Sequence, residues 1–223
     1  MTLYLSRIRL SRSPSAQALS GLLSPPVSGP RRSAHHKLLW AAFADGPDRR
    51  RDFLWREDHD GGFLTLSERP PQPMDLFEPH QVKDFAPALA AGALLDFTLR
   101  ANATRMKRGG KRVDVVMDAL YGLPKGTRAS ERMVVAGREG KAWLERQGET
   151  AGFRVVRAEA DDYAAEVLPG YRGPRKGQPQ FGIVDLSGRI EIGDPAAFLG
   201  QLARGFGRAK AFGCGLMLIR RAS

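Results

Sequence analysis

The clearest hydrophobic pattern lies in the second half of the chain. Between Leu95 and Ala101, apolar residues alternate with polar ones, which predicts a half-buried strand. The elements expected after it are a helix at 138–149, strands at 153–158 and 181–186, a helix that Asp194-Pro195 opens with an N-cap and a first-turn proline, and a strand at 215–219. This βαββαβ order is the split βαβ or RRM-like arrangement of the α+β class.

The first half is compatible with the same plan, although less clearly. Residues 2–10 form a strand candidate whose apolar phase shifts midway, as a β-bulge would produce. The segment 24–30 contains three prolines and is expected to be a loop, with a helix starting near Ala34. Further strands are expected at 53–56, 62–66 and 79–85.

A linker is expected from Pro87 to Gly92, because proline, alanine and glycine dominate there. It divides the chain into an N-terminal domain over residues 1–86 and a C-terminal domain over residues 93–223. The 223 residues suffice for two such compact units.

Composition narrows the class of protein. No stretch of about 18 uncharged apolar residues offers a membrane span. The single cysteine, Cys214, excludes a disulfide framework and fits a reducing cytoplasm. None of the four histidines is paired at the i, i+4 spacing of zinc hydrolases, so neither a metal site nor a cofactor is expected. The acid-free, Arg- and Ser-rich first 44 residues imitate a transit peptide, but a strand beginning near Leu3 argues for folded structure.

Charge indicates a polyanionic partner, with nucleic acid as the leading class. The chain has 35 Lys and Arg against 24 Asp and Glu, a net charge of +11 and a pI near 10.4. Three acid-free segments hold 14 of the cations, which are Arg100, Arg105, Lys107, Arg108, Lys111, Arg112, Arg172, Arg175, Lys176, Arg204, Arg208, Lys210, Arg220 and Arg221. Docking on an anionic membrane is a weaker alternative, because the cations do not follow one face of a helix.

The segment from Gly205 to Gly215 is the most unusual in the chain. It carries Arg208 and Lys210 between glycines, and glycine lets backbone N–H groups approach an anion closely. The signal is weak alone, since helix-to-strand turns also use glycine. The four glycines are Gly205, Gly207, Gly213 and Gly215.

The string from Gly205 to Leu216, GFGRAKAFGCGL, closely resembles the C-terminal glycine-rich motif of the CasE family. These CRISPR-associated endoribonucleases process precursor CRISPR RNA in type I-E systems. Further blocks agree with that family in order, and they are Leu3 to Leu10, HKLLW from His36, Arg51-Asp52-Phe53-Leu54, Leu99-Arg100-Ala101-Asn102, Gly110-Lys111-Arg112 and Ala142-Trp143-Leu144-Glu145-Arg146.

The resemblance implies two tandem ferredoxin-like domains with RNA along the basic face of both. It also implies cleavage at the base of a CRISPR repeat hairpin, leaving a 5′ hydroxyl and a 2′,3′-cyclic phosphate. Members of the family commonly stay bound to the mature crRNA and join the other subunits of the Cascade complex. The residues expected to contact RNA are Arg31, Arg32, the four glycines above, and the 14 cations named above other than Arg204, Arg220 and Arg221.

Carried onto this sequence, the catalytic histidine of the family falls on His36, and its basic loop falls on Arg172, Arg175 and Lys176. The tyrosine that often precedes the histidine by three residues is here Ser33. Candidates for catalytic support are therefore Tyr4, Ser33 and Lys37, and His35 is the substitute if the register differs by one.

The chemistry requires no metal if the protein aligns the 2′-hydroxyl with the departing 5′ oxygen and moves protons. We expect His36 at a helix N-terminus, on a core-facing stripe with Leu39, Trp40 and Phe43. The helix dipole and nearby Arg31, Arg32 and Lys37 would then favour a neutral imidazole. Two alternatives stay open: His36 only caps the helix or fills a core edge, and the protein is a non-catalytic RRM-like RNA-binding subunit.

Overall fold

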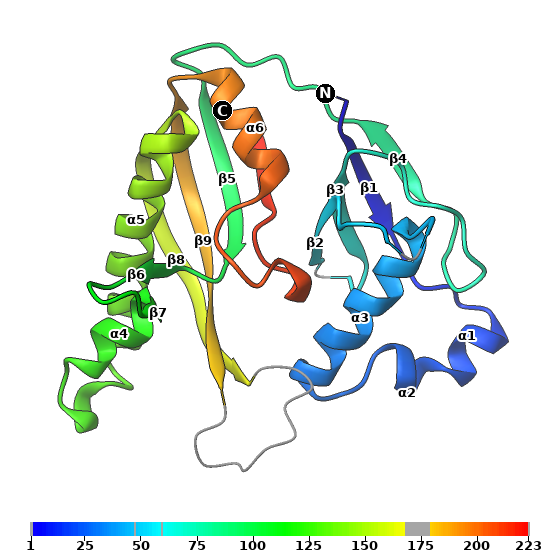
Figure 1. Ribbon diagram of the computed structural model, residues 1–223, viewed down its shortest axis with the longest axis horizontal. Helices are drawn as coiled ribbons and strands as arrows, with labels where there is room; N and C mark the ends of the chain where they lie inside the picture. Colours follow the sequence, from blue (N-terminus) through cyan, green and yellow to red (C-terminus); the bar gives the residue numbers. More distant parts are fainter. Residues whose placement is uncertain (1, 47, 59, 168–178, 223) are drawn as a thin grey trace. The chain divides into compact units, whose positions relative to one another are not determined.

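The computed structural model describes residues 2–222 except 47, 59 and 168–178 (Figure 1). Contacts between Cα atoms divide these residues into two compact units. The first contains residues up to Pro87, with Val167, Pro179 and Lys210–Gly213, and the second contains the remainder. Each unit has its own four-stranded sheet.

The first unit is an antiparallel sheet covered by one long helix (Figure 1). Its elements are β1 Tyr4–Ile8, α1 Pro14–Ala18, α2 Ser20–Leu23, α3 Ser28–Phe43, β2 Phe53–Glu57, β3 Phe63–Ser67 and β4 Gln81–Asp84. The strand order β2-β3-β1-β4 is that of a ferredoxin-like domain. No helix lies between β3 and β4, so only the first of the two usual helices is present.

The core of the first unit forms where α3 meets the sheet. Leu39 and Phe43 of α3 pack on Phe53, Trp55 and Phe63, all nearly inaccessible to solvent. Phe53 and Trp55 are two residues apart on β2 and therefore face the helix together. This face of the sheet fixes which side of α3 is buried.

Two expectations for this unit are wrong. β1 pairs with β3 without interruption from Tyr4 to Ile8, so there is no bulge, and the polar Ser6 takes a buried position where the apolar pattern breaks. Helix α3 begins at Ser28, six residues before Ala34. Pro30 is tolerated because it lies in the first turn, where backbone N–H groups have no intrahelical partner.

The second unit confirms the expected βαββαβ order. Its elements are β5 Leu94–Ala101, β6 Thr104–Met106, β7 Arg112–Asp114, α4 Val115–Tyr121, α5 Arg132–Ala151, β8 Phe153–Val167, β9 Gln180–Ile192, α6 Pro195–Arg204 and β10 Met217–Arg221. The sheet order β10-β5-β9-β8 repeats that of the first unit. Helices α5 and α6 cover one face (Figure 1), where they bury residues such as Trp143 and Phe198. As expected, the Asp194 carboxylate accepts the first free N–H groups of α6.

An insertion that the sequence pattern did not predict follows β5. Strands β6 and β7 form a hairpin whose turn contains Gly109 and Gly110, both at positive φ, a conformation that glycine adopts without strain. Asp114 ends the hairpin and caps α4 by accepting N–H groups from Val116 and Met117. The basic residues between Arg105 and Arg112 therefore lie on this hairpin.

Among the helices of the described residues, none is long and apolar enough to cross a membrane.

Candidate active site and RNA-binding surfaces

The adjacent histidines of α3 have different surroundings. His35 is 1% exposed, and its ring packs edge-on against Phe63 with 4.8 Å between centroids. Its Nε2 lies 3.2 Å from the Ser24 hydroxyl, and its Nδ1 lies 3.7 Å from the Glu57 carboxylate. Burial lowers the pKa of His35, and Glu57 opposes that effect. His35 is therefore part of the core between α3 and the sheet.

His36 lies at the edge of the same core and is only partly buried. Its ring meets Trp40 edge-on at 6.0 Å and Phe53 at 6.5 Å between centroids. Its Nδ1 is buried and has no hydrogen-bond partner within the described residues. In the expected stripe, Leu39 and Phe43 are buried, but His36 and Trp40 are only partly buried, and the fully buried histidine is His35.

The pKa of His36 is lowered, first by burial and then by the positive charge of Arg51. The expected cause, a helix N-terminus, is wrong: His36 is eight residues beyond Ser28, and the helix dipole acts mainly within the first turn. A neutral imidazole at neutral pH follows nevertheless, from desolvation and a neighbouring cation.

Arg51 is the residue near His36 that the sequence reasoning did not single out. Arg51 is exposed, and its guanidinium forms no ion pair with another described residue. The neighbouring Asp52 is occupied by Arg49 at 3.0 Å and Arg69 at 2.6 Å. The sequence could have indicated Arg51, because it lies two residues before Phe53. Side chains two residues apart on an extended chain point to the same side, so Arg51 would be expected on the side of Phe53.

The candidates for catalytic support lie at different distances from His36. Ser33 is one turn before it on α3 and half-buried, and Lys37 follows it and is exposed. Tyr4 is in a cross-strand row with Ser67 and Phe53, which places it two strand spacings, roughly 10 Å, from Phe53. Ser33 and Lys37 are thus the nearer candidates.

Arg31 and Arg32 lie in the first turns of α3. Their charges lower the pKa of His35 rather than that of His36. An Arg32 Nη1–H donates to the Phe212 carbonyl at 3.5 Å, which ties α3 to the Lys210–Gly213 segment of the first unit. At least one donor of Arg32 thus serves the fold.

Several cations predicted to bind RNA are held by carboxylates in the second unit. Arg100 of β5 makes two hydrogen bonds, 2.8 and 2.7 Å, to the opposing Asp185 of β9. On the β6–β7 hairpin, Arg105 and Lys107 both reach Asp118, at 2.7 and 2.5 Å. Part of the positive charge therefore stabilises the fold.

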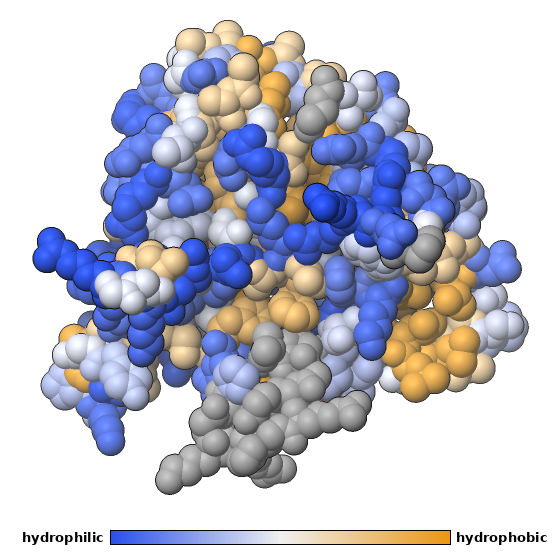
Figure 2. Space-filling model, in the orientation of Figure 1, coloured by the Kyte–Doolittle hydropathy of each residue, from blue (hydrophilic) through white to orange (hydrophobic). Residues whose placement is uncertain are grey.

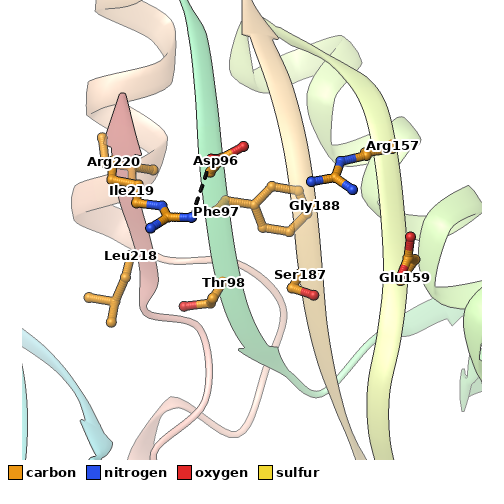
Figure 3. Close-up of a pocket in the computed structure, with 10 residues that line it drawn as sticks. All are labelled: Asp96, Phe97, Thr98, Arg157, Glu159, Ser187, Gly188, Leu218, Ile219 and Arg220. Atoms are coloured by element: carbon orange, nitrogen blue, oxygen red, sulfur yellow. Dashed lines mark ion pairs between the residues drawn. The ribbon is translucent and has the colours of Figure 1, made fainter. Parts of the chain in front are cut away.

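The sheet of the second unit has an ion network on the face opposite its helices. Asp96 accepts from Arg189 at 2.8 Å and lies 3.5 Å from Arg220, beside a cavity of about 410 Å³ (Figure 3). Where β5 and β9 pair, the outward positions are Leu94, Asp96, Thr98, Arg100, Asp185, Ser187, Arg189 and Glu191. None is aromatic, whereas RRM sheets stack bases on aromatic residues at such positions.

The turn of the β6–β7 hairpin differs from its base. Arg108, Lys111 and Arg112 are exposed, and the ion pairs of the described chain include none of the three. The Arg112 Nη1–H donates to the Thr104 hydroxyl over a long distance of 3.5 Å. Among the residues that the structure describes, no carboxylate pairs with the charges of this turn.

The glycines of the Gly205–Gly215 segment shape the backbone. All four predicted positions have positive φ, and a Cβ at Gly207 would lie 2.7 Å from the Asn102 carbonyl oxygen. Four N–H groups of the segment donate to backbone carbonyls of the protein, those of Gly205, Phe206, Arg208 and Gly215. Arg208 is exposed and Lys210 half-buried.

The predicted basic loop of Arg172, Arg175 and Lys176 lies outside the described residues. Within them, no group of three or more His, Cys, Asp or Glu side chains is placed to hold a metal ion.

A family model described as "CRISPR associated protein" matches residues 3–221, almost the whole chain. The chain belongs to the CRISPR-associated protein family. A curated relative is the CRISPR-associated endoribonuclease Cse3 of Thermus thermophilus, 36% identical over 146 residues. That match covers 61% of this CRISPR-associated protein and 60% of the relative, so it spans less than two thirds of either chain.

Solved structures match this CRISPR-associated protein over nearly its full length. A structure of Cse3 bound to a 19-nucleotide RNA has a TM-score of 0.68 and 25% identity, with 98% of each chain covered. Cas6e from Escherichia coli K-12 has a TM-score of 0.62 and 20% identity, with 98% of this chain and 100% of that one covered, and shows the shared fold. The expectation of two ferredoxin-like domains is confirmed.

Proposed function

We propose that this protein is a metal-independent endoribonuclease that binds and cuts a CRISPR repeat hairpin. The products are a 5′ hydroxyl and a 2′,3′-cyclic phosphate, and the protein keeps the mature crRNA as a Cascade subunit in the cytoplasm. In support, the curated relative is an endoribonuclease, and a structural relative binds RNA. The retention of product rests on the resemblance to CasE proteins.

The observation that carries the proposal is the placement of His36. Its imidazole is at the edge of the core rather than inside it, its pKa is lowered by burial and by Arg51, and the charge of Arg51 is not taken up by a described carboxylate. A neutral imidazole accepts a proton at neutral pH, and a nearby guanidinium stabilises a phosphate. Cleavage by the proposed route uses both, the imidazole of His36 and the guanidinium of Arg51, at the phosphodiester that is cut.

The reaction has the RNA 2′-hydroxyl as its nucleophile. His36 takes the 2′ proton through Nε2, the 2′ oxygen bonds to phosphorus, and the bond from phosphorus to the 5′ oxygen breaks. Arg51 offsets the charge that grows on the phosphate oxygens. The departing 5′ oxygen takes up a proton, and the candidate donors are Tyr4, Ser33 and Lys37, of which Ser33 and Lys37 share α3 with His36.

Binding draws chiefly on exposed cations of the second unit. The strongest contributions come from exposed residues that pair with no carboxylate of the described chain, namely Arg108, Lys111, Arg112 and Arg208. Contacts from Arg172, Arg175 and Lys176 are part of the same proposal. Such contacts to phosphates supply affinity through counterion release, whatever the sequence.

The test is cleavage of a synthetic repeat hairpin by purified protein in EDTA. We expect cutting at the base of the stem, with a cyclic phosphate on the 5′ fragment identified by mass spectrometry. A matched hairpin with a 2′-deoxy sugar before the scissile phosphate should bind and remain intact. Cutting of that control would contradict attack by the 2′-hydroxyl, and a requirement for added metal would contradict metal independence.

A further inference from the structure

Tyr121 is a large aromatic side chain on the surface, at the last residue of α4. It is 79% exposed, although tyrosine carries a large apolar ring that is usually at least partly buried. The guanidinium of Arg128 lies over the ring, 4.8 Å from its centroid. One side of the ring therefore has a cation stacked on it, while most of the side chain remains open to solvent.

Arg128 is held in that position by its own hydrogen bonds. Its Nε donates to the Leu123 carbonyl and its Nη2 to the Tyr121 carbonyl, both at 3.0 Å. The guanidinium plane is thus fixed before any ligand arrives, and it limits the motion of the ring against it. An aromatic surface ordered in advance loses little entropy when a second flat group stacks on it.

The basic hairpin lies close to Tyr121. Asp118 is one helical turn before Tyr121 and holds the side chains of Arg105 and Lys107, so these cations are on the same side of α4. Residues 104–132 include eight Lys or Arg and three Asp or Glu, of which the half-buried Asp114 is the N-cap of α4. Figure 2 shows the region of the hairpin as a strongly hydrophilic projection.

We propose that Tyr121, backed by Arg128, is a stacking platform for an unpaired base next to the stem of the bound RNA. Stacking on an aromatic ring suits any base, and the adjacent cations suit the phosphates on either side. The surplus of positive charge favours RNA over a protein partner as the occupant. This inference rests on the proposed function for the identity of the RNA, but not on cleavage.

The test compares non-cleavable hairpins that carry a 2′-deoxy sugar at the scissile position, made with and without unpaired flanks. A 2-aminopurine base at successive flank positions reports stacking by loss of fluorescence. For Tyr121→Leu we expect about 10-fold weaker binding of the flanked hairpin, unchanged binding of the stem alone, and loss of quenching. Tyr121→Trp should retain both, since it keeps a flat aromatic surface.

Val134→Ala, a change at another exposed apolar residue of the second unit, is the matched control and should bind as wild type. Equal affinity of wild type and Tyr121→Leu for the flanked hairpin would overturn the platform. So would normal RNA binding by Tyr121→Leu with failed assembly among purified Cascade subunits, which would mark a protein-docking surface. If wild type binds flanked RNA through Tyr121 but cuts nothing, the platform stands and the proposed function falls.

Discussion

The open sheet face of the second unit and the edge of α3 in the first unit both carry arginines, but in different surroundings. On the sheet, Arg100 is joined to Asp185 and Arg189 to Asp96 across neighbouring strands. Near His36, Arg51 forms no ion pair with a described residue, because the adjacent Asp52 pairs with Arg49 and Arg69 instead. The number of arginines on a surface therefore does not show whether that surface binds RNA. The positions of the carboxylates decide which arginines are available to a phosphate.

The two histidines of α3 repeat this contrast within one helical turn. His35 has its ring nitrogens near Ser24 and Glu57, whereas His36 has an enclosed Nδ1 and a neighbouring cation. We infer that the first serves packing and the second serves chemistry. Changes at these positions should separate stability from activity.

The largest effect is expected from the histidines. His36→Ala should lower the single-turnover cleavage rate by roughly 10²–10⁴-fold, because it removes the proton acceptor, with little change in RNA affinity. His35→Ala should instead lower the free energy of unfolding by about 1–3 kcal/mol, because it leaves a gap against Phe63. Quenched-flow cleavage and urea denaturation measure the two. A folded His35→Ala that cannot cut, beside an active His36→Ala, would reverse the assignment.

Next in size is the change Arg51→Gln. Removing the cation beside the phosphate should slow single-turnover cleavage by about 100-fold. Arg50→Gln removes the same charge from the adjacent exposed residue and is the matched control, expected to cut at nearly the wild-type rate. Equal slowing by both variants would show that only the general field of the protein matters.

A smaller effect is expected at Arg100. Arg100→Met removes two hydrogen bonds to Asp185 and should lower the free energy of unfolding by about 1–2 kcal/mol, measured by urea denaturation. RNA affinity should stay within about 2-fold of wild type, since that charge is already offset by a carboxylate. A large loss of RNA affinity with normal stability would place Arg100 among the RNA contacts after all.

The smallest effect is expected at the hairpin turn. Lys111→Gln should weaken hairpin binding by about 3-fold near physiological salt and reduce the slope of log affinity against log salt by about 1. Stability should not change, because Lys111 is exposed. An unchanged salt slope in fluorescence anisotropy would show that this turn does not meet a phosphate.

The second unit could be predicted from sequence because its signals are local. Alternation along β5 and the N-cap at Asp194 depend on neighbours in the chain, and both were correct. The β6–β7 hairpin was missed because its strands are three residues each, too short for a periodic pattern. The start of α3 was placed too late because Pro30 was taken to exclude a helix. Pro30 lies in the first turn of α3, where a proline does not break a helix.

The site could be predicted only as far as residue type. Spacing along α3 predicted a buried stripe, but the sheet determines which histidine lies in it, and the Phe63 that meets His35 is 28 positions away. The partner of Arg100 is 85 residues distant, so its carboxylate was not apparent from charge counting. At Gly207 of the glycine-rich segment the backbone passes close to the Asn102 carbonyl. Anion binding by this segment stays a prediction.

The most direct test of the account is the pH dependence of single-turnover cleavage in EDTA at subsaturating protein, because that rate, like kcat/KM, reports the pKa values of the RNA-free protein. Burial and Arg51 lower the pKa of His36 below the ordinary 6.5, so the neutral, proton-accepting form persists to lower pH. We predict that the rate rises with pH through a midpoint below 6.5 and is flat at neutral pH, and that Arg51→Gln moves the midpoint upward. A midpoint above 6.5, or the same acidic limb in the residual activity of His36→Ala, would contradict a catalytic His36.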